Sequence, residues 1–119
     1  MTQNFSINGW INLRSQSPII INSGYNQVDL NTIVTNANEI TIYLDQGRCY
    51  DEEEKQYHKT YKSTYDGFTH YDVLGLIHKT YWLACRDIWN NDKDFFSNLA
   101  LHTFEFDPDT NTVYPSTDS

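Results

Sequence analysis

Residues 40–45, Ile-Thr-Ile-Tyr-Leu-Asp, carry the clearest structural pattern in the chain. Aliphatic side chains alternate with polar or aromatic ones, which is the period-2 pattern of a strand that buries one face. Turn-forming residues flank the stretch on both sides. The pattern therefore predicts a β-strand whose buried face carries Ile40, Ile42 and Leu44.

Further along the chain, three tyrosines follow one another at four-residue spacing, at Tyr57, Tyr61 and Tyr65. This spacing puts them on one face of either a helix or a strand, so the period alone does not decide between the two. The Thr and Tyr content favours a strand, whereas the order of acidic before basic residues favours a helix. We interpret the segment as a strand that ends at Asp66-Gly67.

A helical pattern begins after this strand. Apolar residues recur at steps of three and four between Tyr71 and Trp89, and Thr69 stands where an N-cap is expected. Gly75 inside the helix costs about 1 kcal/mol relative to alanine. A short second helix is predicted over 94–101.

The C-terminal part is typical of a β-hairpin, with strands at 101–106 and 112–114 and a turn at 107–111. We expect one globular domain over 1–115 and a polar tail over 116–119. Towards the N-terminus, short strands are predicted at 5–13, 19–21 and 28–34. Together these elements predict an α+β fold, an antiparallel β-sheet covered on one face by one or two helices.

Composition limits the kinds of partner. The 119 residues include 8 Lys and Arg against 16 Asp and Glu, a formal net charge of −8. Direct binding to nucleic acid or to an anionic membrane is disfavoured, because both need clustered cations. Aromatic residues make up 15% of the chain, so large rings supply much of the apolar area that a core needs.

No targeting segment or membrane-length apolar run is visible, and the chain contains two cysteines, Cys49 and Cys85. Two reduced thiols in a cytoplasmic protein are the simplest interpretation, although a disulfide between them stays open.

No catalytic, metal or cofactor site stands out. The short ligand spacings of metal sites are missing among the four histidines, His58, His70, His78 and His102. Asp107, Asp109, Asn111 and Asp118 match four positions of a calcium loop, but Thr112 stands where that loop needs glycine. We interpret 107–111 as an ordinary hairpin turn.

One acidic run does stand out. Asp51, Glu52, Glu53 and Glu54 are consecutive and lie just before the tyrosine-spaced segment. The simplest explanation of the run is a solvated loop tip or a first helical turn, because acidic side chains favour helix N-termini. In a binding surface, carboxylates speed association with a basic protein and aromatic rings serve as anchors. The candidate partner-binding residues are therefore Asp51, Glu52, Glu53, Glu54, Tyr57, Tyr61 and Tyr65.

In composition alone, the chain is similar to small acidic antagonists, such as immunity proteins that neutralise bacterial toxins or phage inhibitors of host defence proteins. The expected function is a non-enzymatic inhibitor that occludes a basic partner, for example a toxin nuclease. Two alternatives remain open. One is a small hydrolase with a His and carboxylate site, and the other is a ligand-binding module with an exposed tryptophan at Trp10, Trp82 or Trp89.

Overall fold

The computed structural model describes residues 2–12, 20–22, 31–45, 56–63, 66–87 and 100–118. Within these ranges the strands are β1 (Gln3–Asn12), β2 (Ile20–Asn22), β3 (Ile33–Thr35), β4 (Glu39–Asp45), β5 (Gln56–Lys62), β6 (Phe68–Thr69), β7 (Ala100–Asp107) and β8 (Thr112–Asp118). The helix is α1 (His70–Asp87).

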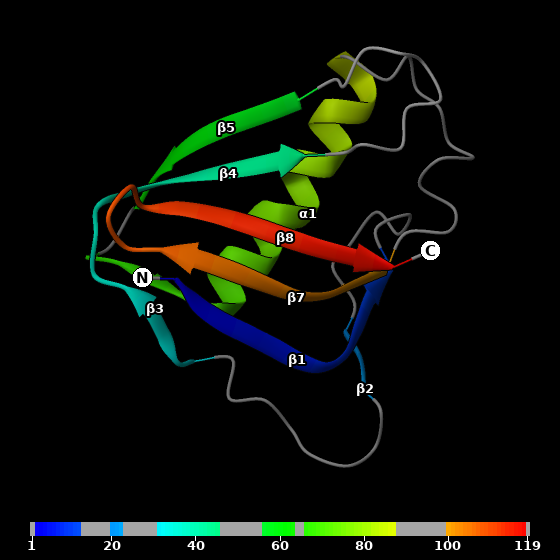
Figure 1. Cartoon of the computed structure of the whole chain (residues 1–119), viewed down its shortest axis with the longest axis horizontal. Coiled ribbons are helices and arrows are strands. Elements are labelled where there is room, and N and C mark those ends of the chain that lie inside the picture. Colours follow the sequence, from blue (N-terminus) through cyan, green and yellow to red (C-terminus); the bar gives the residue numbers. More distant parts are fainter. Residues whose placement is uncertain are drawn as a thin grey trace.

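Six of these strands form one sheet, in the order β2-β1-β7-β8-β4-β5. Neighbouring strands run antiparallel except β4 and β8, which are parallel. The parallel pair arises because the β7–β8 hairpin, late in the sequence, fits between the earlier strands β1 and β4. Figure 1 shows the helix α1 lying behind this sheet. The fold is therefore α+β, as the sequence predicts, with the described helix on one face of a mixed sheet.

The core lies between α1 and the sheet. Ile40, Ile42 and Leu44 of β4 are fully buried there, which confirms the burial predicted from their alternation. The other buried apolar side chains come from α1, β3, β6, β7 and β8 and are Val34, Phe68, Val73, Leu74, Ile77, Tyr81, Ala84, Leu101, Phe104, Phe106 and Val113. Burial of these groups is the main stabilising contribution to the fold.

A second, two-stranded sheet of β3 and β6 leads into the helix. Gly67 precedes β6 with a φ of 105°, and a Cβ added there would lie 2.6 Å from the Thr35 backbone oxygen. Glycine is the residue that tolerates both conditions. The Thr69 hydroxyl then accepts a hydrogen bond from Asp72 N, and the Asp72 carboxylate accepts one from Thr69 N. This reciprocal capping fixes the start of α1 and confirms Thr69 as its N-cap.

Several sequence predictions are confirmed. The segment that periodicity left undecided is the strand β5 over 56–62, which ends at Lys62 and not at Asp66-Gly67, and the predicted helix is α1. The β7–β8 hairpin turns at 107–111, where Asp109 N donates to Asp107 Oδ1 and Asn111 has a φ of 52°.

Three predictions need correction. Residues 116–118 belong to β8 rather than to a tail, because they pair with β7 from Ala100 to Thr103. Ala100 and Leu101 lie in β7 and not in a second helix, whose other predicted residues fall outside the described ranges. The strand predicted at 28–34 is the shorter β3, since Asn31 is in a turn and 28–30 are not described.

Candidate functional site

Of the predicted binding residues, the structure describes Tyr57 and Tyr61. Asp51 to Glu54 and Tyr65 lie outside the described residues. Tyr57 pairs with Leu44 and Tyr61 with Ile40 across β4 and β5, so both rings share the face that α1 covers. Both are partly buried against the core. The prediction that their spacing places them on one face is confirmed for Tyr57 and Tyr61, and this face points towards α1.

Tyr61 is tied to the helix by its hydroxyl, which lies 2.8 Å from Thr80 Oγ1. Lys79 Nζ lies over the same ring, 5.7 Å from its centroid, at a distance typical of a cation–π contact. Burial raises the pKa of the Tyr61 hydroxyl, and the hydrogen bond with Thr80 offsets part of that rise. These contacts give Tyr61 a structural role in joining β5 to α1.

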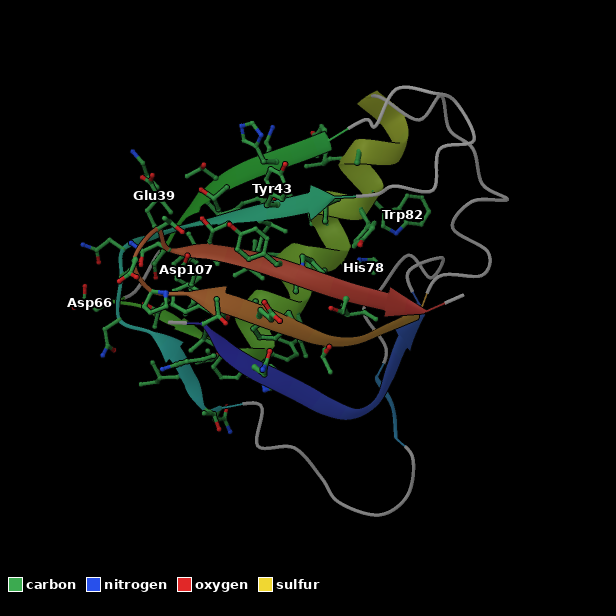
Figure 2. The ribbon with its side chains drawn as sticks, viewed as in Figure 1. Glu39, Tyr43, Asp66, His78, Trp82 and Asp107 are labelled. Carbon is green, nitrogen blue, oxygen red and sulfur yellow. The ribbon has the colours of Figure 1, made fainter. Side chains whose placement is uncertain are left out.

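The other face of the sheet is left uncovered by the described elements. Side chains alternate along each strand, so the residues between the buried ones point away from α1. We call this surface the open face, and its described members include Asn4, Glu39, Thr41, Tyr43, His58, Thr60, Lys62, Thr103, Glu105, Asp107, Thr112, Tyr114 and Ser116. Figure 2 shows Tyr43 on the near side of β4, whereas α1 lies on the far side.

A central row crosses the open face over five adjacent strands. The register pairs Asn4 with Glu105, Glu105 with Tyr114, and Tyr43 with His58. The rings of Tyr43 and Tyr114 are 5.7 Å apart at 62°, an edge-on contact. Those of Tyr43 and His58 are stacked, 6.4 Å apart at 14°. Aromatic pairs at such distances contribute about 0.5–1.5 kcal/mol each, so ring contacts stabilise the arrangement of Tyr114, Tyr43 and His58.

A second row, beside the first, consists of hydroxyls and a carboxylate. Asp107 pairs with Thr112, Thr112 with Thr41, and Thr41 with Thr60. The Thr41 and Thr60 hydroxyls lie 2.9 Å apart. This half of the open face can exchange hydrogen bonds with a bound molecule through short, adaptable side chains.

Carboxylates gather at one end of the sheet. Glu39 begins β4, Asp107 ends β7, Asp109 is in the following turn, and Asp66 lies between β5 and β6. In Figure 2, Glu39, Asp66 and Asp107 all lie at the left end of the sheet. Lys62 is the cross-strand neighbour of Glu39. The described part of the chain therefore presents a mainly negative end of the sheet.

The described histidines are dispersed. His58 lies on the open face, His70 is buried at the start of α1, and His78 is buried beside Trp82, whose Nε1 donates to His78 Nε2 at 3.2 Å. Among the described residues, no group of three or more His, Cys, Asp or Glu side chains is placed to hold a metal ion.

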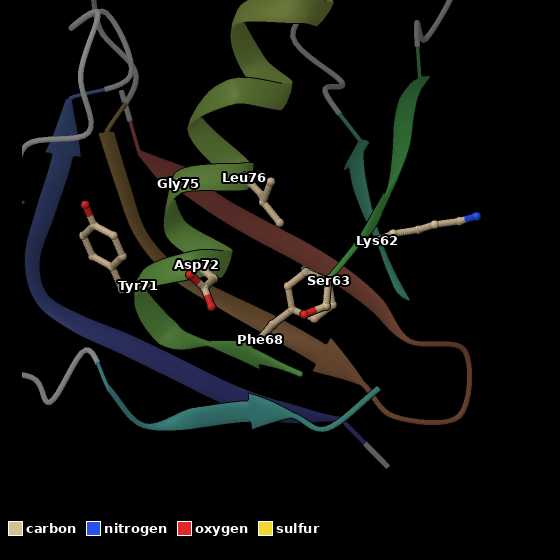
Figure 3. A pocket seen from close by; sticks show the side chains of 7 residues that line it. All are labelled: Lys62, Ser63, Phe68, Tyr71, Asp72, Gly75 and Leu76. Carbon is tan, nitrogen blue, oxygen red and sulfur yellow. The ribbon is translucent and has the colours of Figure 1, made fainter. Parts of the chain in front are cut away.

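A shallow groove of about 390 Å³ lies between the first turns of α1 and the strands β5 and β6. Figure 3 shows its lining residues, Lys62, Ser63, Phe68, Tyr71, Asp72, Gly75 and Leu76. The side chains of Lys62 and Tyr71 extend away from each other there. Ser63 Oγ donates to Gly67 O, and the Asp72 carboxylate caps the helix. Ser63 and Asp72 therefore use these hydrogen bonds to stabilise the local structure around the groove.

Trp82 is the described tryptophan of the three considered for ligand stacking. It is 39% exposed on α1, while its neighbour Tyr81 is fully buried. The side chains of Trp10 and Trp89, and those of Cys49, Cys85 and His102, fall outside the described residues.

Sequence reasoning missed Tyr43, Glu105 and Tyr114 as candidates. Tyr43 and Glu105 stand at the polar positions of alternating strands, which is a signal that they point away from the core. Their proximity needs strand order, and residue spacing does not supply it.

No helix among the described residues is long and apolar enough to cross a bilayer. Comparison of the chain with protein-family models, with curated proteins and with solved structures finds no match.

Proposed function

We propose that this protein is a non-enzymatic antagonist that binds a basic protein, such as a toxin nuclease or another nucleic-acid-binding enzyme, through its open face. The proposal includes action in the cytoplasm. The observation that carries it is the central row, in which Tyr43, Tyr114, His58 and Glu105 lie on neighbouring strands of a sheet face that the described elements leave uncovered.

The chemistry of the open face suits a protein partner. Antibody binding loops are likewise enriched in tyrosine, serine and asparagine, because rigid rings supply contact area and short polar groups adapt. Tyr114 is 37% exposed and Glu105 is exposed, so both are accessible. The described aliphatic core residues lie on the other side of the sheet, so the open face can stay in water until a partner binds.

Charge favours a basic partner. The net charge of −8 steers a positive surface towards the protein, and Glu39, Asp66 and Asp107 lie at one end of the sheet that carries the rings. Negative charge and polar contact groups would complement the positively charged cleft of a nucleic-acid-binding enzyme. The run Asp51–Glu54 adds to the same net charge.

Affinity capture with the full chain tests the proposal. Wild type and two variants, Tyr114→Ser and Tyr71→Ser, are used to capture proteins from the source cells. Tyr71 is 60% exposed on α1 and serves as a matched control away from the open face. We expect a basic protein to bind wild type and Tyr71→Ser, and Tyr114→Ser to bind it roughly tenfold more weakly.

The captured protein is then purified and its own activity is measured with and without the antagonist, at low and high salt. Inhibition that weakens with salt supports the proposal. A captured protein that is acidic, that keeps full activity in the complex, or that binds Tyr114→Ser as tightly as wild type would contradict it.

A further inference from the structure

The arrangement of Glu105, Tyr114 and Tyr43 indicates which kind of side chain of the partner would bind at this part of the open face. Glu105 and Tyr114 are directly opposite each other on β7 and β8, a placement that brings cross-strand side chains to about 5 Å. The Tyr43 ring contacts Tyr114 edge-on from β4. Glu105, Tyr114 and Tyr43 therefore follow one another on the adjacent strands β7, β8 and β4 of the open face.

The Glu105 carboxylate has room for a partner. It is exposed, and no ion pair engages it within the described part of the chain. The nearest described cation on the open face by strand order, Lys62, pairs in register with Glu39 on β4 and belongs to a different row. Asn4, the cross-strand neighbour of Glu105 on β1, is neutral. A cation supplied from outside would thus meet an unneutralised carboxylate.

The tyrosine rings favour arginine over lysine as the basic side chain that binds here. A guanidinium group is planar, so it can stack on a tyrosine face while its two parallel N–H groups donate to one carboxylate. A lysine ammonium is a compact, strongly hydrated charge, so it cannot stack a planar face on a ring and donate two parallel hydrogen bonds to a carboxylate. A carboxylate beside aromatic rings matches arginine in both shape and charge.

We infer that Glu105, Tyr114 and Tyr43 form a receptor for an arginine side chain of the basic partner. This inference rests on the proposed function and specifies what the open face recognises. Asp107, on the same strand as Glu105 and two residues along, strengthens the negative field around the receptor. His58 stacks on Tyr43 from β5 and supports that ring.

The first experiment uses two probes, acetyl-Gly-Arg-Gly-amide and acetyl-Gly-Lys-Gly-amide, titrated into the full-length protein and followed by NMR. We expect the arginine probe to shift the signals of Tyr43, Glu105 and Tyr114 and to bind at least about threefold more tightly than the lysine probe. Glu105→Gln should weaken arginine binding by about tenfold. Asp66→Asn, which removes a carboxylate remote from the rings, is the matched control and should leave it unchanged.

Equal binding of the two probes, or shifts spread over all the surface carboxylates, would overturn the arginine receptor.

The second experiment tests the arginine receptor separately from the proposed antagonist function. If the captured partner binds equally well after its interface arginines are changed to lysine, the receptor is wrong and the antagonist function stands. If no basic partner is captured while the arginine probe still binds at Glu105, the proposed function is wrong and the receptor stands.

Discussion

The hydroxyl groups of Tyr61 and Thr80 lie 2.8 Å apart and join the edge strand β5 to α1. Thr80 Oγ1 donates its own hydrogen to Leu76 O at 2.6 Å, so the Tyr61 hydroxyl is the donor to Thr80. The contact fixes the orientation of a strand that has a described neighbour, β4, on one side only.

We expect Tyr61→Phe to lower the free energy of unfolding by about 0.5–1.5 kcal/mol, because a partly buried hydrogen bond is lost while the ring is kept. Urea denaturation followed by circular dichroism measures this. Tyr114→Phe, which removes an exposed hydroxyl from the open face, is the control and should change stability by less than about 0.5 kcal/mol. Equal effects of the two substitutions would show that the Tyr61–Thr80 contact contributes nothing.

Stability should fall as pH falls, because of His70. This side chain is 2% exposed, its Nε2 has no hydrogen-bond partner among the described residues, and its ring lies edge-on to Phe5 and Phe104. Burial lowers the pKa of His70 in the folded protein. The unfolded chain therefore binds a proton at His70 below about pH 6.5, whereas the folded protein binds it only at lower pH. Unfolding becomes more favourable as the solution becomes acidic.

The stability contributed by neutral His70 is complete above about pH 6.5 and is lost as pH falls towards the lowered pKa, by no more than about 1.4 kcal/mol per pH unit. Urea denaturation at about pH 7.5 and about pH 5.5 detects the loss. His70→Phe removes the titrating group, so the difference between the two pH values should shrink. An unchanged difference would assign the acid sensitivity to other groups.

Two glycines should respond to alanine in opposite directions. At Gly67 a Cβ would meet the Thr35 backbone oxygen at 2.6 Å and the φ of 105° disfavours alanine, so Gly67→Ala should destabilise the fold by about 1–3 kcal/mol. Gly75 lies within α1, where an added Cβ would meet no described atom within 4 Å apart from the adjacent residues and the nearby backbone of the helix itself, so Gly75→Ala should stabilise the fold by about 0.5–1 kcal/mol. The melting temperatures of both variants, compared with wild type, test this prediction. A shift in the same direction for both variants would contradict it.

The start of α1 should depend on the reciprocal bonds of Thr69 and Asp72. Thr69→Ala removes the acceptor for Asp72 N and should cost about 1 kcal/mol of unfolding free energy. Thr69→Ser retains the hydroxyl and is the matched control. Hydrogen exchange of the Asp72 amide should be faster in Thr69→Ala and near wild type in Thr69→Ser, and equal exchange in both would exclude a capping role.

Local patterns in the sequence were sufficient for several elements. The alternation of Ile40, Ile42 and Leu44 predicts both the strand and its buried face, because side chains of a strand point to opposite sides in turn. The step of three and four residues after Thr69 predicts α1, and the hairpin turn at 107–111 follows from its Asp, Pro and Asn content. Net charge, which drives the proposal of a basic partner, is also a property of the sequence alone.

Tertiary structure decided what lies against what. Spacing placed Tyr57 and Tyr61 on a common face, but pairing of β5 with β4 directs that face towards α1 instead of solvent. Residues 116–118 lack a strong strand pattern and become part of β8 because β7 supplies their hydrogen-bonding partners. The central row unites Asn4, Tyr43, His58, Glu105 and Tyr114 from five strands. Periodicity within a segment assigns a face but carries no information on strand order, and strand order alone brings these residues together.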